Sequence, residues 1–172
     1  MFQQVYFIIF LTGTSKHHIP IDGCINQSKL TSLQFLTFGT FLGQPGIDHL
    51  SGIWDTLQTI PTENCIRNVI LLICDINFLN TVRTGPQGCF NANWEAFDRQ
   101  ISRLSNGKPL NLILHMYYRI SSRRKEDRSS ADSNQASRAC EAALERLVKE
   151  KLKLVKNSPH IKITLDSMDD FP

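Results

Sequence analysis

Asp75 is the acidic residue best placed for chemistry, because it directly follows the apolar run of residues 69–74. An acidic side chain at the carboxyl end of a parallel strand is where α/β enzymes place nucleophiles and metal ligands. A two-aspartate phosphatase would need a second carboxylate two residues later, and Asn77 occupies that position. We therefore interpret Asp75 as a polar residue that ends a strand.

Two glycine-containing segments partly resemble phosphate-binding loops. Residues 13–16 read Gly-Thr-Ser-Lys, but they lack the first glycine and the final Gly-Lys-Ser/Thr of a phosphate loop, whose N–H groups and lysine surround the phosphate. Gly39, Gly43 and Gly46 do not match the spacing of a dinucleotide-binding loop. With Pro45, these three glycines predict a turn.

His17, His18, Asp22 and Cys24 are metal-binding residue types within one short segment. Zinc requires four ligands that converge in a tetrahedron. Adjacent histidines in an extended chain point to opposite sides, so His17 and His18 do not converge. The segment predicts an exposed loop, and we expect neither a metal nor a cofactor.

The cysteine spacing supports no disulfide framework or zinc ribbon. The count is odd and no Cys-x-x-Cys pair occurs among Cys24, Cys65, Cys74, Cys89 and Cys140. Cys74 lies inside an apolar run and is interpreted as a small buried residue. The pattern indicates a reduced setting, cytoplasmic or nuclear.

Length and composition limit the function classes. A chain of 172 residues corresponds to one domain or to a few repeats of a solenoid. With 41% hydrophobic and 20% charged residues it has the composition of a globular protein, and a net charge of +3 does not indicate a nucleic-acid partner. The apolar run of residues 5–11 is too short to cross a membrane, so we interpret it as a buried first strand and expect no membrane partner.

Apolar spacing predicts alternating strands and helices along the remaining chain. Alternating or continuous apolar residues predict strands at 32–38, 68–74, 110–117 and 160–165, and the continuous run at 68–74 predicts a strand covered on both faces. Apolar residues three and four apart predict helices at 47–60, 93–104 and 136–155, with Trp54 and Trp94 in the core. The polar segment 119–135 predicts an exposed loop.

Cap residues support the ends of two predicted helices. Asp48 or Ser51 would cap the first helix, and Asn91 or Asn93 the second. Asn106-Gly107 is typical of a left-handed stop at the end of the second helix.

Strand followed by helix recurs three times before a last strand, with strand anchors at Leu33, Val69, Leu112 and Ile161. This order requires parallel strands joined by helical crossovers. The predicted fold class is α/β. The similar units favour an irregular leucine-rich-repeat-like solenoid with all helices on one side, and the alternative is a small doubly wound domain.

The segments Ile53-Trp54-x-x-Leu57-x-x-Ile60-Pro61 and Trp94-x-x-Phe97-x-x-x-Ile101, with residues 30–38, 66–69 and 160–164, carry a family resemblance. Over residues 30–167 the chain resembles the C-terminal part of the uncharacterised F-box and leucine-rich-repeat-like proteins of mushroom-forming fungi. Residues 1–29, an N-terminal segment with an apolar strand and a loop, do not resemble the family, and residues 168–172 are a tail. No segment matches the F-box module, so the resemblance does not extend to the part that would bind a ubiquitin-ligase core.

The resemblance and the repeat imply a non-enzymatic scaffold that binds a protein partner on its strands. The expected partner surface comprises Gln34, Asn111, His115, Lys162 and Thr164. The alternative doubly wound domain would be a hydrolase or nucleotide-binding domain. Its site would lie at the strand ends, near Thr12, Gly39, Asp75 and Tyr118.

Overall fold

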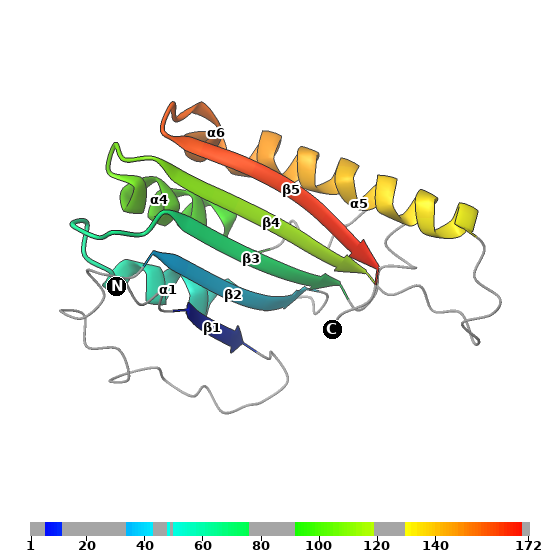
Figure 1. Cartoon of the computed structure of the whole chain (residues 1–172), viewed down its shortest axis with the longest axis horizontal. Coiled ribbons are helices and arrows are strands. Elements are labelled where there is room, and N and C mark those ends of the chain that lie inside the picture. The colour runs from blue at the N-terminus through cyan, green and yellow to red at the C-terminus, as the bar shows by residue number, and fades with distance from the viewer. Residues whose placement is uncertain are drawn as a thin grey trace, which may run out of the picture.

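The computed structural model describes residues 6–11, 34–42, 48, 50–75, 92–118 and 130–169. Its centre is a five-stranded sheet in which all neighbouring strands are parallel (Figure 1). The strands follow one another across the sheet in the order of the chain. They are β1 (Tyr6–Leu11), β2 (Phe35–Leu42), β3 (Asn68–Asp75), β4 (Leu110–Tyr118) and β5 (Ile161–Asp169).

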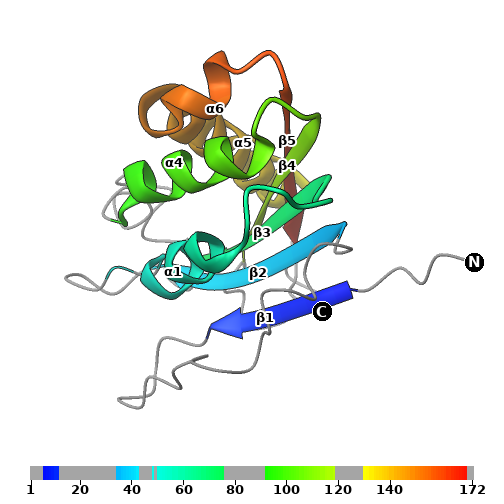
Figure 2. The same ribbon diagram turned by 90° about the vertical axis from the view of Figure 1, so that its left-hand side faces the viewer.

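The described helices all lie on one face of this sheet (Figure 2). They are α1 (Ser51–Thr59), α4 (Trp94–Ser105), α5 (Ser130–Lys151) and α6 (Lys153–Asn157). Crossovers between parallel strands are right-handed, so a sheet that always grows in the same direction receives every helix on the same side. The predicted α/β fold with parallel strands is therefore confirmed.

The strand register defines which residues are equivalent in successive units. Leu36 pairs with Val69, Val69 with Leu112, and Leu112 with Ile163. The predicted anchors Val69 and Leu112 are thus equivalent. The residue of β5 that pairs with Leu112 is Ile163 and not the predicted anchor Ile161. The unit length rises from 33 to 43 and then 51 residues, because each crossover is longer than the one before.

A single apolar layer fills the space between the sheet and its helices. Trp94 and Phe97 of α4 are 1% and 0% exposed and pack edge to face, with ring centroids 5.8 Å apart. Trp54 of α1 is partly buried against the same core, and its indole Nε1 donates to Asp48 Oδ2 at 3.2 Å. Trp94 therefore lies in the core, as predicted, and Trp54 packs against it. The sheet contributes alternate residues: Leu36, Phe38, Val69, Leu71, Ile73, Leu110, Leu112, Leu114 and Met116.

The helix ends follow the cap chemistry of the sequence with one difference. Asn93 caps α4, since its side chain accepts from Ala96 N at 3.1 Å, and Asn106 ends the helix with φ of 42°. The N-cap of α1 is Leu50, which has no side-chain cap. Asp48 acts two residues earlier instead, because its Oδ1 accepts from Leu50 N and from Asn93 N, both at 3.1 Å. One carboxylate thus joins the segments that enter α1 and α4.

Arg103 of α4 joins its unit to the unit before it. Its guanidinium donates to Leu57 O at 2.5 Å and to Ile60 O at 2.9 Å, which are carbonyls at the end of α1. A cation at a helix C-terminus also interacts favourably with the helix dipole. Burial lowers the pKa of the Arg103 guanidinium from its ordinary value, which reflects the water it loses in this position.

Replacing Arg103 with methionine is expected to lower the free energy of unfolding by about 1–2 kcal/mol. Methionine keeps much of the apolar side chain but leaves the two α1 carbonyls without these donors. Urea unfolding measures the change. Arg99→Met, an exposed arginine on the same helix, is the control and should alter stability by less than about 0.5 kcal/mol. Equal effects of the two variants would contradict the inter-unit role.

Several predicted boundaries are wrong in the structure. The third helix begins at Ser130, so the predicted loop is wrong for residues 130–135, and it is divided at Leu152 into α5 and α6. Gly39 does not lie in a turn. It lies within β2 and pairs with Leu72 of β3. β2 and β5 also extend to Leu42 and Asp169, beyond their predicted ends.

Residues 12–33, 43–47, 76–91 and 119–129 lie outside the described residues. They contain Thr12, the 13–16 segment, His17, His18, Asp22 and Cys24.

The predicted N-terminal segment, residues 1–29, contains β1, which pairs in parallel with β2. This segment therefore contributes a strand to the same sheet as the repeats. Within the described residues, none of the helices combines the length and apolar character needed to cross a membrane.

Candidate functional site

The sheet has a second face that none of the described helices covers, here called the helix-free face. Strand alternation turns one residue in two toward it, because successive side chains point to opposite sides of a strand. These residues are exposed or half-buried, whereas their neighbours on the helix side of β2, β3 and β4 are almost completely buried. The described side chains of this face are Phe35, Thr37, Asn68, Ile70, Leu72, Asn111, Ile113, His115, Tyr117, Lys162, Thr164 and Asp166.

The register arranges these side chains in rows across the strands. Ile70 of β3 pairs with Ile113 of β4, so two half-buried isoleucines lie side by side. Thr37 and Thr164 continue this row on β2 and β5. The result is a partly exposed apolar centre with a hydroxyl group at each end.

A polar row lies beside the apolar centre, toward the start of the strands. Asn68, Asn111 and Lys162 are neighbours in register. Asn111 Nδ2 donates to Asn68 Oδ1 at 3.0 Å, which fixes both amides in a ladder across β3 and β4. Because Asn111 and Lys162 are exposed, this row offers amide and ammonium groups to a partner.

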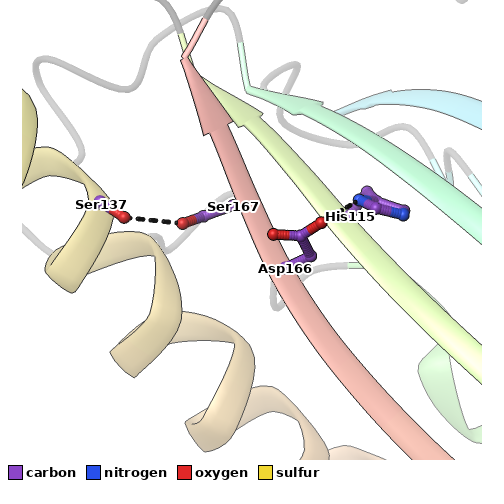
Figure 3. A network of polar contacts seen from close by, with 4 residues as sticks. All are labelled: His115, Ser137, Asp166 and Ser167. Carbon is purple, nitrogen blue, oxygen red and sulfur yellow. Dashed lines mark hydrogen bonds and ion pairs between the residues drawn. The ribbon is translucent and has the colours of Figure 1, made fainter.

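An acidic residue and a histidine lie on the other side of the apolar centre. His115 and Asp166 are paired in register, and His115 Nδ1 lies 3.1 Å from Asp166 Oδ2 (Figure 3). The contact lacks the direction of a hydrogen bond, so it is an electrostatic contact that becomes an ion pair when the imidazole is protonated. The Tyr117 ring stacks near the imidazole, with centroids 6.5 Å apart. The Asp166 side chain remains 43% exposed and available to a partner.

Serine, histidine and aspartate occur close together here but do not form a nucleophilic site. Ser167 follows Asp166 directly, and its hydroxyl contacts Ser137 of α5 at 2.9 Å on the helix side (Figure 3). His115 and Asp166 lie on the opposite side of the sheet, so the β5 backbone separates Ser167 from the imidazole. A serine nucleophile needs its base within hydrogen-bond reach. Ser167 does not meet this condition.

Four of the five predicted partner residues are brought together on the helix-free face. Asn111, His115, Lys162 and Thr164 lie on adjacent strands β4 and β5. Gln34 lies just before β2, where its carbonyl oxygen accepts from Arg67 N and Asn68 N, and strand alternation places it in phase with Leu36 on the helix side.

Sequence reasoning missed both Asp166 and the apolar centre of this face. Asp166 has the same phase as Lys162 and Thr164, so the signal was present, but the strand was predicted to end at residue 165. Ile70 was missed because a continuous apolar run predicted a strand covered on both faces. Among the described residues, helices cover only one face of β3, and Ile70 is half-buried.

The described residues of the alternative enzyme site, Gly39, Asp75 and Tyr118, do not lie at a crevice of the kind that doubly wound domains use. Asp75 and Tyr118 end β3 and β4 in register, whereas Gly39 lies in the middle of β2. Ligand crevices of doubly wound sheets form where the strand order reverses. The order of the five described strands does not reverse.

The described residues contain no group of three or more His, Cys, Asp or Glu side chains that could hold a metal ion. Cys65 is exposed and Cys140 is buried. Comparisons with models of protein families, with curated proteins and with solved structures find no match to this chain.

Proposed function

We propose that the chain is a non-enzymatic protein–protein interaction scaffold that binds its partner on the helix-free face. One observation carries this proposal: a partly exposed apolar centre, Ile70 and Ile113, has the polar side chains of Asn68, Asn111 and Lys162 on one side and those of His115 and Asp166 on the other. Protein interfaces have this composition, with an apolar core that excludes water and a polar rim that supplies hydrogen bonds.

The sheet gives such a surface a fixed shape before binding. Its backbone is hydrogen-bonded from strand to strand, and its other side packs on the common core. Residues held on rigid strands lose little conformational freedom when a partner binds, which reduces the cost of association. The sequential strand order and one-sided helices also support the leucine-rich-repeat-like solenoid, and with it a relation to F-box substrate adaptors.

Replacing Ile113 with aspartate is expected to weaken partner binding at least about tenfold without unfolding the chain. The charge would lie at the apolar centre and would have to be dehydrated in the complex. The measurement has two steps. Proteins captured from the source cell by the wild-type chain are compared with those captured by the variant, and the affinity of any partner lost with the variant is then measured with purified proteins.

The matched control is Ala142→Asp, which introduces the same charge at an exposed position of α5, on the helix side of the sheet. Circular dichroism melts establish that both variants are folded. A purified partner that binds the two variants equally would overturn the assignment of the helix-free face. If the purified wild-type chain turned over a substrate and the Ile113→Asp variant kept that activity, the scaffold proposal itself would be overturned.

A further inference from the structure

The corner where α5 meets α6, residues 149–156, carries a concentrated positive charge. It contains four lysines and one glutamate, an excess of three positive charges that equals the net charge of the whole chain. The charges of all other residues therefore balance. The lysines are Lys149, Lys151, Lys153 and Lys156, of which Lys151 is half-buried and the other three are exposed. This segment is here called the basic corner.

The acidic residues around the basic corner do not neutralise its lysines. Glu150 accepts from Arg146 Nε at 2.9 Å and so already has a cation. Asp98 of α4 is 3% exposed, and both of its oxygens accept from backbone N–H groups of α6. Glu145 lies one helical turn before Lys149 without forming an ion pair with it. Within the part of the chain that the structure describes, none of the four lysines forms an ion pair.

Leu154 lies inside the basic corner and is 50% exposed. Among the described residues it is the only large apolar side chain that is exposed. Leu152 and Val155 beside it are 0% exposed, so α6 packs on the core through them and turns Leu154 outward. A single exposed leucine is ordinary on a protein surface. This one differs because it lies among cations that have no carboxylate partner.

The backbone of the basic corner is fixed before any partner binds. Leu152 N donates to Val148 O at 3.3 Å and Lys156 N donates to Leu152 O at 3.0 Å, so helical hydrogen bonds continue around the corner. The buried carboxylate of Asp98 accepts from Leu154 N itself at 2.9 Å. A surface that is already ordered loses less conformational freedom on association, which favours binding.

We propose that the basic corner binds an acidic protein segment that carries an apolar side chain among its carboxylates. The carboxylates pair with the lysines, and the apolar side chain packs on Leu154. This surface lies on the helix side of the sheet, opposite the helix-free face (Figure 2). It is therefore a second contact surface, beyond the one proposed above.

The residue types of the basic corner favour a protein over other polyanions. Surfaces that bind single-stranded nucleic acid combine cations with aromatic side chains that stack on bases, and residues 149–156 contain no aromatic residue. An anionic bilayer takes up the broad apolar face of an amphipathic helix. Leu152 and Val155 of this corner are committed to the core, which leaves Leu154 alone to face outward. One apolar side chain matches a single apolar residue of a protein segment.

The charge contact is tested with the full chain and a fluorescein-labelled synthetic peptide in which glutamates flank one leucine. Fluorescence anisotropy at low salt should give a dissociation constant below about 0.1 mM for the wild type. Lys153→Glu combined with Lys156→Glu should weaken binding at least about tenfold, because two attractive contacts become repulsive. The matched control, Arg67→Glu combined with Arg138→Glu, changes the net charge equally at exposed positions outside the basic corner. It should alter the affinity less than about twofold.

The apolar contact is tested with a second peptide in which serine replaces the leucine. Leu154→Ser should weaken binding of the leucine peptide at least about threefold, because the buried apolar contact is lost. The same variant should leave binding of the serine peptide within about twofold of the wild type. Equal effects of Leu154→Ser on the two peptides would show that the leucines do not meet, and would contradict the proposal.

The remaining outcomes also decide against the proposal. These are a wild-type dissociation constant above about 0.1 mM, or a control variant that loses as much affinity as the lysine reversal. Tighter binding of a single-stranded oligonucleotide, or of phosphatidylcholine vesicles containing phosphatidylserine, would assign the basic corner to that class of partner instead. Circular dichroism melts establish that each variant is folded. Failure here leaves the Ile113 test unaffected, because that test concerns the opposite face of the sheet.

Discussion

Replacing Phe97 with alanine is expected to lower the free energy of unfolding by about 3–5 kcal/mol, the usual cost of removing a buried phenylalanine. Phe97 is 0% exposed and lies in the first turn of α4, where its ring meets that of Trp94 at 84°. The substitution removes apolar contacts and leaves a cavity that surrounding elements cannot fill. Folded domains are stable by about 5–15 kcal/mol, so this loss would be a large fraction of the total free energy of unfolding.

Urea unfolding followed by tryptophan fluorescence measures this change. Leu154→Ala is the control, because Leu154 is also an apolar helical residue but is 50% exposed. It should change stability by less than about 0.5–1 kcal/mol. A Phe97→Ala loss below about 1 kcal/mol would show that α4 does not carry the core in the way the packing indicates.

The apolar spacing predicted the middle of the fold well. The helix predicted at 93–104 is observed as Trp94–Ser105, and the strand predicted at 68–74 as Asn68–Asp75. Both have strong periodic patterns and flanking cap or turn residues, so local chemistry and tertiary packing favour the same structure. The long helix was less predictable at its start, because residues 130–135 carry no apolar stripe and helix can extend from a packed segment into a polar one.

The candidate surface was only partly predictable, because alternation reports the face of a residue but not its neighbour on the next strand. His115 and Lys162 could be assigned to a face from their own strands. The contact of His115 with Asp166 depends on the register of β4 against β5, which the chain sets through the long crossover between them. Contacts between helices, such as Arg103 with the end of α1, are hidden from sequence for the same reason.

Asp98 makes a second contact between helices that the sequence does not reveal. It is 3% exposed and lies on α4 directly after Phe97. Its Oδ2 accepts from Leu154 N at 2.9 Å and its Oδ1 from Val155 N at 3.0 Å, at the start of α6. The N-cap of α6, Leu152, supplies no side-chain bond of its own. A carboxylate from another helix therefore performs the capping role.

Asp98→Ala is expected to lower the free energy of unfolding by about 2–3 kcal/mol, because two N–H groups lose a charged acceptor and the Val155 bond is buried. Asp98→Asn keeps one acceptor oxygen and should lose about half as much. Arg99→Ala, at the exposed neighbouring position, is the control and should stay within about 0.5 kcal/mol.

Amide hydrogen exchange separates this capping role from a general loss of stability. A cap that acts on α6 alone should accelerate exchange first at Leu154 and Val155, while amides in β3 and β4 respond only through global unfolding. If Asp98→Ala accelerated exchange equally throughout the sheet, the carboxylate would be stabilising the core as a whole. Because α4 also holds the end of α1 through Arg103, selective exchange at α6 would show that this helix fixes its two neighbours through separate polar contacts.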